Sequence, residues 1–245
     1  MTKKKNACIL SEYRTDKCAS CTNLCQHRIA LEGLDGRSGR LGSAGLPNDY
    51  RGITLANSPA REGQSNIYKI LERYVATFKR NDDDEPIKSL YLWSESPGTG
   101  KTTTASALIS EWIAVEYLSA LKRGEHPSQS SAYFLDINEL QTSYNLATMT
   151  NDDEAMKRMG NTIKRTQRAK FAVIDDIGVR DATAAFRSYV HALVNFRVAE
   201  GLPTVYTSNL PIDAMAQVFD ARLYDRIRDQ CADIHFEGSS KRGRR

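Results

Sequence analysis

Several features that would assign this chain to a particular class are missing from its 245 residues. No run approaches the ~20 consecutive apolar residues that a membrane-spanning helix requires, and the basic start at Lys3, Lys4 and Lys5 is not followed by the apolar region of a signal peptide. No internal repeat is evident, and a net charge of +4 is too small to indicate nucleic-acid binding by itself. We therefore expect a cytoplasmic globular protein with no membrane partner.

The length allows one sizeable α/β domain and a small appended module. The hydrophobic content of 40% suits a globular chain. Basic residues gather at both ends, at Lys3 to Lys5 and again at Lys241, Arg242, Arg244 and Arg245. Such tails are either solvated chain ends or contacts with nucleic acid, and the charge pattern leaves both interpretations open.

Four of the five cysteines are Cys8, Cys18, Cys21 and Cys25, and His27 follows closely. Thiolates and an imidazole at such short separations can bind one tetrahedral zinc ion, and metal binding is more common than disulfides in a cytoplasmic protein. We predict a zinc site made by Cys18, Cys21, Cys25 and His27. Cys8 as a replacement ligand, an iron–sulfur cluster, and reduced thiols without a metal remain alternatives.

The segment 31–57 is rich in glycine, serine and arginine, which is typical of a linker or an extended arm. We therefore predict three parts: an N-terminal cysteine-rich module at 1–30, a linker at 31–57, and the main domain at 58–245.

The main domain contains a motif typical of a phosphate-binding loop between Ser94 and Thr104. A β-prone run from Ser89 to Trp93 precedes it, and apolar residues at helical spacing follow it. Phosphates bind to backbone N–H groups at a helix start and to a lysine that reaches over the loop. The residues predicted to hold a nucleotide are Pro97, Gly98, Thr99, Gly100, Lys101, Thr102 and Thr103. The hydroxyl of Thr102 is the candidate magnesium ligand.

The loop departs from the usual pattern G-x-x-x-x-G-K-[ST] at its first glycine, where this chain has Glu95. A carboxylate there would repel phosphate if it pointed inward. The alternative interpretation, a glycine-rich turn that caps an ordinary helix, does not require a lysine followed by hydroxyl residues.

The run from Phe171 to Ile174 is apolar and ends in Asp175 and Asp176, which predicts a buried parallel strand with carboxylates at its C-terminal edge. Asp175 is placed to hold magnesium through water, and Asp176 to orient or deprotonate an attacking water molecule. A further strand at 203–208 ends before Asn209, whose amide either senses the γ-phosphate or caps the next helix.

Three arginines, Arg222, Arg226 and Arg228, lie on a short predicted helix near the end of the chain. Arginine can stabilise charge on a transferring phosphoryl group, often from a neighbouring subunit. Surface arginines are common, so the spacing alone is a weak signal.

Taken together, the Pro-Gly-Thr-Gly-Lys-Thr-Thr-Thr, Val-Ile-Asp-Asp-Ile-Gly, Thr-Ser-Asn-Leu and Arg-Leu-Tyr-Asp-Arg-Ile motifs resemble those of the AAA+ ATPases. More narrowly, their order is similar to that of the bacterial and phage replicative helicase loaders of the DnaC/DnaI type, to which the IstB transposition helpers are related. The resemblance covers roughly 47–242. It implies an α/β fold with a central parallel sheet flanked by helices, joined here to a small N-terminal metal-binding module.

The resemblance also implies roles for individual residues. It makes Lys101 and Thr102 the Walker A residues, Asp175 and Asp176 the Walker B pair, Asn209 sensor one, Arg222 the arginine finger with Arg226 as its alternative, and Arg242 sensor two. Many AAA+ proteins have a glutamate at the position of Asp176, and the shorter aspartate suggests slow hydrolysis that suits a switch. The implied cofactors are ATP, Mg²⁺ and Zn²⁺.

The expected function is ATP-dependent loading of a replicative helicase hexamer onto single-stranded DNA. In this resemblance the N-terminal module docks on the helicase, and the chain assembles with itself or on its partner when nucleotide is bound. Two alternatives remain open. One is a transposase helper of the IstB type, and the other is a zinc-dependent nucleic-acid-binding adaptor whose nucleotide site does not hydrolyse ATP.

Overall fold

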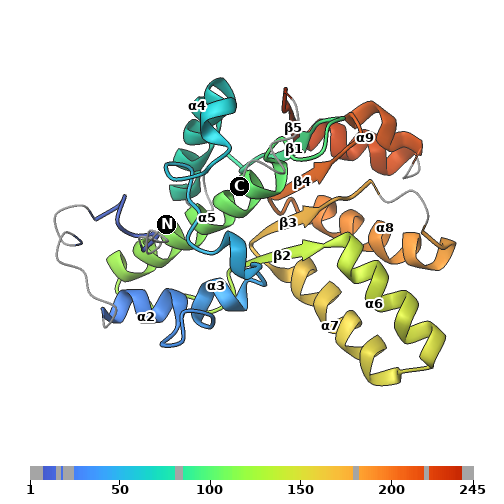
Figure 1. The fold of residues 1–245 in the computed structure, drawn as a ribbon, viewed down its shortest axis with the longest axis horizontal. Coiled ribbons are helices and arrows are strands. Elements are labelled where there is room, and N and C mark those ends of the chain that lie inside the picture. Colours follow the sequence, from blue (N-terminus) through green and yellow to red (C-terminus); the bar gives the residue numbers. More distant parts are fainter. Residues whose placement is uncertain are drawn as a thin grey trace, which may run out of the picture.

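The computed structural model describes residues 8–14, 18, 25–80, 85–178, 182–217 and 221–238. Within these ranges the chain forms a five-stranded sheet in the order β2-β3-β4-β1-β5, with every neighbouring pair parallel (Figure 1). The strands are β1 (Ser89–Trp93), β2 (Ala132–Asp136), β3 (Phe171–Asp175), β4 (Thr204–Ser208) and β5 (Cys231–His235). The predicted α/β fold with a central parallel sheet is therefore confirmed.

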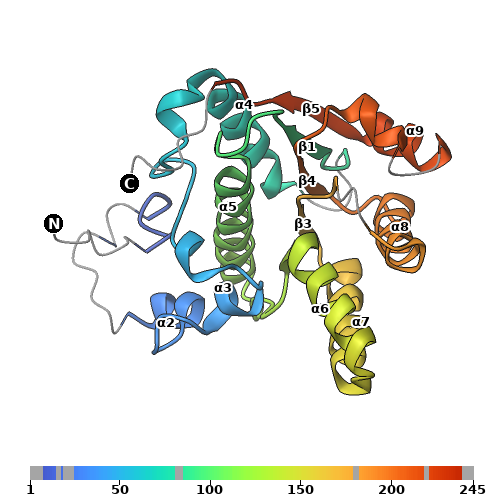
Figure 2. The same cartoon turned by 45° about the vertical axis from the view of Figure 1, so that its right-hand side comes forward.

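Helices cover both faces of the sheet (Figure 2). One face carries α2 (Gln26–Glu32), α3 (Gly39–Ser43), α4 (Ser65–Ala76) and α5 (Lys101–Lys122). The other carries α6 (Ile137–Thr150), α7 (Asp153–Arg168), α8 (Ala184–Ala199) and α9 (Ala221–Gln230). Short 3-10 turns are η1 (Asn48–Tyr50), η2 (Arg61–Gly63), η3 (Thr77–Lys79) and η4 (Ile212–Gln217). None of the helices in the described ranges is both long and apolar enough to cross a bilayer.

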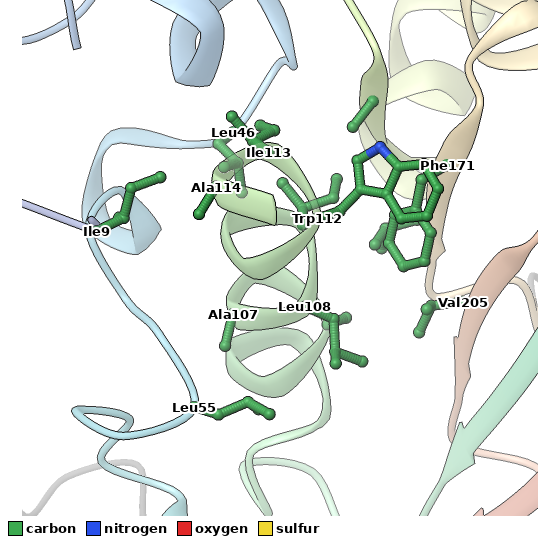
Figure 3. Packing of buried hydrophobic residues seen from close by; sticks show 14 of the residues in the cluster. Ile9, Leu46, Leu55, Ala107, Leu108, Trp112, Ile113, Ala114, Phe171 and Val205 are labelled. Carbon is green, nitrogen blue, oxygen red and sulfur yellow. The ribbon is translucent and has the colours of Figure 1, made fainter. Parts of the chain in front are cut away.

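Helix α5 is the centre of the larger hydrophobic cluster. Its residue Trp112 stacks on Phe171 of β3, with ring centroids 5.0 Å apart and an interplanar angle of 13°. Figure 3 shows Ile9 and Leu55 on the opposite side of α5, away from the sheet. The helix is thus buried on two sides, which explains why its apolar residues are not confined to one stripe.

Residues 31–57 differ from the linker expected from their glycine content. Leu31, Leu41, Leu46 and Leu55 are all buried, and they belong to the same cluster as α5. The leucines between the glycines bury enough apolar surface to hold the segment against the main domain.

The same segment covers the outer edge of strand β2. The backbone N–H of Phe134 donates to the carbonyl of Ala44 at 2.7 Å, and the Arg165 guanidinium of α7 donates to the carbonyl of Ser43 at 2.7 Å. The edge strand β2 therefore has a backbone partner on its outer side as well.

On the other face, Arg197 of α8 is completely buried. Its guanidinium donates to the carbonyls of Thr166 (2.7 Å), Ala169 (2.8 Å) and Pro203 (2.9 Å), and to the Thr204 hydroxyl (2.8 Å). Burial lowers the pKa of this side chain to about 10. The arginine therefore stays charged near neutral pH and joins α8 to the chain segments that enter β3 and β4.

Candidate functional site

The phosphate-loop motif lies between β1, which ends at Trp93, and α5, which begins at Lys101. Gly98 (φ 74°) and Gly100 (φ 104°) have left-handed backbone conformations that a residue with a Cβ adopts only with strain. The Lys101 ammonium donates to the carbonyls of Ser94 (3.3 Å) and Ser96 (3.2 Å), so its charge lies within the curve of the loop.

Two further residues of the loop bear on phosphate binding. The hydroxyl of Thr99 is buried and has no hydrogen-bond partner among the described residues, which is unusual for a buried polar group. A ligand oxygen would supply the missing partner. Glu95 is exposed to solvent and does not fill the loop. The arrangement fits a bound phosphate.

The carboxylate of Asp175, at the end of β3, joins three elements. It accepts hydrogen bonds from the Thr102 hydroxyl of α5 at 3.1 Å and from the Thr207 hydroxyl of β4 at 2.6 Å. The predicted phosphate loop and the predicted acidic strand end therefore meet in space, although the sequence separates them widely.

Burial is the main reason that the pKa of Asp175 rises to about 7, and the nearby carboxylates of Asp176 and Asp136 raise it further. This site thus has an excess of negative charge in a place with little water. Magnesium prefers oxygen ligands, and the Thr102 hydroxyl and the Asp175 carboxylate lie side by side here. These residues fit a bound magnesium ion.

Asp176 is held in an uncommon conformation next to Asp175. Its backbone is left-handed (φ 55°), and its N–H donates to the Thr207 hydroxyl at 2.9 Å. Its carboxylate accepts a hydrogen bond from the Asn138 amide at 3.1 Å. Strain of this kind is often found at functional sites. The contact from β4 thus holds the backbone of Asp176, and the contact from α6 aims its half-buried carboxylate.

Sequence reasoning missed three members of this cluster: Thr207, Asn138 and Asp136. Asp136 caps α6 and accepts N–H bonds from Asn138 (2.8 Å) and Glu139 (3.1 Å). A signal existed for Asp136, because it ends an apolar strand as Asp175 does, and the two are paired across the sheet. No local pattern pointed to Asn138.

The remaining predicted nucleotide-site residues are less closely gathered. Asn209 is exposed and lies one residue beyond β4, at the same sheet edge as the two acids. Arg222 is in the first turn of α9, and Arg226 of the same helix donates to the Asn195 side chain of α8 at 3.0 Å. Arg242 lies outside the described residues.

The predicted zinc ligands do not converge in the part of the chain that the structure describes. Cys18, Cys25 and His27 are described and Cys21 is not, and no group of three metal-binding side chains is found among the described residues. The His27 Nδ1 atom lies 2.9 Å from the Tyr117 hydroxyl of α5. Burial lowers the pKa of the imidazole, and the positive charge of Arg14 lowers it further. Because His27 is directed at α5, the structure does not support the predicted zinc site.

A known protein shares part of this chain's sequence. No family model matches the chain. The chain is 25% identical over 167 residues to the replicative helicase loader DnaC of Escherichia coli K12, a match that covers 68% of this chain and 59% of the loader. The chain thus matches less than two thirds of the length of this curated relative.

Solved structures resemble the fold over a larger share of the chain. The DnaI structure has a TM-score of 0.55 at 22% identity and covers 80% of this chain and 94% of its own. A primosome component from Streptococcus pyogenes serotype M3 has a TM-score of 0.54 at 21% identity and covers 80% and 92%, respectively. The chain therefore shares the fold of these structures, and the predicted resemblance to the DnaC/DnaI type of loader is confirmed.

Proposed function

We propose that this chain is an ATP-dependent loader that places a replicative helicase on single-stranded DNA. The observation that carries the proposal is the junction at Asp175, where the carboxylate meets Thr102 of the phosphate-loop helix and Thr207 of β4. Such a junction suits a nucleotide-dependent switch, because a ligand at the loop acts on three elements at once. The similarity to the DnaC loader over 68% of the chain favours this partner over others.

In this proposal different residues bind the nucleotide and support its hydrolysis. Lys101 and the loop backbone hold the phosphates, and Thr102 with Asp175 would hold magnesium, which supplies positive charge against the phosphate oxygens. Asp176 orients the attacking water and accepts its proton, and Asn138 aims that carboxylate. An aspartate reaches less far than a glutamate, so we expect slow, switch-like hydrolysis that DNA or the partner stimulates.

Assembly forms the second part of the proposal. Arg226 is engaged by Asn195 within its own chain, which favours Arg222 as the arginine that acts on a neighbouring nucleotide site. Asn209 senses the γ-phosphate, and Arg242 completes the site as sensor two. The N-terminal cysteine-rich part of the chain docks on the helicase.

The test is a reconstituted helicase-loading assay on single-stranded DNA. Lys101→Ala should abolish ATP-dependent loading, since it removes the charge inside the phosphate loop. Lys122→Ala is the matched control, because Lys122 is an exposed lysine at the other end of the same helix. Normal loading by Lys101→Ala would refute an ATP-driven role.

Two further experiments separate the alternatives. Affinity purification from the native host should recover a helicase, and recovery of a transposase without a helicase would replace the loader by a transposition helper. DNA-stimulated ATP hydrolysis that is lost in Asp175→Asn would exclude an adaptor with an inactive nucleotide site.

A further inference from the structure

A buried carboxylate outside the nucleotide site holds two distant segments on α5. Glu111, in the middle of the helix, is only 3% exposed. One of its oxygens accepts the backbone N–H of Leu55 at 2.8 Å, and the other accepts the hydroxyl of Tyr13. Burial raises the pKa of both Glu111 and Tyr13, so the tyrosine keeps its proton and remains a donor.

The first of the two segments is residues 8–14, which we call the N-terminal segment. Ile9 and Leu10 are each 1% exposed and belong to the cluster around α5. A second hydrogen bond joins this segment to residues 54–60, because the Thr54 hydroxyl donates to the Glu12 carboxylate at 2.5 Å. Figure 3 shows Ile9 and Leu55 on the same side of α5. The N-terminal segment is therefore packed as part of the main domain.

The second segment, residues 54–60, continues to the phosphate loop. A Cβ atom placed on Gly100 would lie 2.5 Å from the Cβ of Ala60, so the Ala60 methyl group packs closely against the backbone of Gly100. Tyr68 of α4 links the same segment to the start of α5, since its hydroxyl lies 2.6 Å from that of Ser58 and 2.8 Å from that of Thr104. Movement of residues 54–60 would therefore release one side of the phosphate loop.

We propose that Glu111 and Tyr13 are positioning residues for nucleotide binding. They hold residues 54–60 against the phosphate loop and make the N-terminal segment part of the nucleotide-binding unit. This inference rests on the proposed function only in that the loop binds a nucleotide. Because coupling between two sites is reciprocal, a partner that draws the N-terminal segment off α5 weakens nucleotide binding, and bound nucleotide strengthens the attachment of the segment.

The first test is equilibrium binding of a fluorescent ADP analogue, with magnesium, to Tyr13→Phe. The variant keeps the aromatic packing and loses the hydroxyl that Glu111 accepts, and we expect about five- to tenfold weaker binding. Tyr74→Phe is the matched control. Tyr74 is also half-buried against the same cluster, and its hydroxyl donates to the Lys88 carbonyl at 2.8 Å, away from residues 54–60. The control should bind the analogue like the wild type.

The second test uses the unaltered chain, so it does not depend on the folding of a variant. Hydrogen exchange read by mass spectrometry should slow in residues 8–14 when ADP and magnesium are added. Equal affinities for Tyr13→Phe and the wild type, or exchange in 8–14 that nucleotide leaves unchanged, would overturn the inference and leave the proposed function standing. Failure of the wild type to bind nucleotide would overturn both.

Discussion

The hydroxyl of Thr207 offers a sharp test of the nucleotide site, because it contacts both acidic residues. Thr207 is fully buried in β4, donates to the Asp175 carboxylate at 2.6 Å and accepts the Asp176 N–H at 2.9 Å. Replacement by valine keeps the shape of the side chain and removes both hydrogen bonds. The predicted effect is therefore electrostatic, with little change in packing.

The size of the effect follows from what the two acids lose. A hydrogen bond to a charged group contributes about 1.5–3 kcal/mol, and a buried donor that loses its partner costs about 1–3 kcal/mol. Relaxation around the site recovers part of this, so we expect Thr207→Val to lower the free energy of unfolding by about 2–3 kcal/mol. Displacement of Asp175 should also weaken magnesium-dependent nucleotide binding by about tenfold, equivalent to about 1.4 kcal/mol.

Urea unfolding with and without ADP and magnesium measures both quantities in one series. Thr207→Ser is the control, because it keeps the hydroxyl and loses only a methyl group, and it should retain most of the nucleotide affinity. The reasoning fails if the valine variant binds nucleotide like the wild type, or if the serine variant loses as much affinity as the valine variant.

Three further predictions concern other parts of the molecule. Magnesium-dependent nucleotide affinity should fall as pH drops below about 7, where Asp175 takes up the proton that the cation must displace, and calorimetric titration of Asp175→Asn should show no such dependence. Gly100→Ala should abolish binding of the fluorescent ADP analogue in a chain that still folds, because the new methyl group meets Ala60 at a left-handed position. Arg197→Met should lower the free energy of unfolding by about 3 kcal/mol in urea, since several buried carbonyls lose their donor.

The sheet was predictable because parallel strands buried on both faces have continuous apolar runs. The runs at Ser89–Trp93 and Phe171–Asp175 match β1 and β3 as the structure has them, and the run at 203–208 contains β4. The phosphate loop was equally clear, since its glycines, lysine and hydroxyl residues are contiguous in the sequence.

The contacts around the acids could not be predicted from any local pattern. Asn138 meets Asp176, and Thr207 meets Asp175, only because β2 and β4 are the two neighbours of β3. Strand order is a property of the whole fold, and a run of residues does not encode which strand lies beside it.

The burial of Glu111 was hidden for a related reason. A glutamate in a helix is usually solvated, and the sequence around it does not reveal that residues 8–14 and 54–55 cover that side of α5. Likewise, the glycines of 31–57 drew attention away from leucines such as Leu41, whose burial depends on a helix far along the chain.

The contact between Ala44 and Phe134 has a consequence for solubility. An edge strand with free N–H and C=O groups is a template on which other chains can pair and aggregate. Here the backbone at 43–45 occupies the outer side of β2. A fragment that begins at residue 58 would keep every motif of the nucleotide site but would lack this cover on β2. We therefore expect the fragment to aggregate through that edge more readily than the full chain.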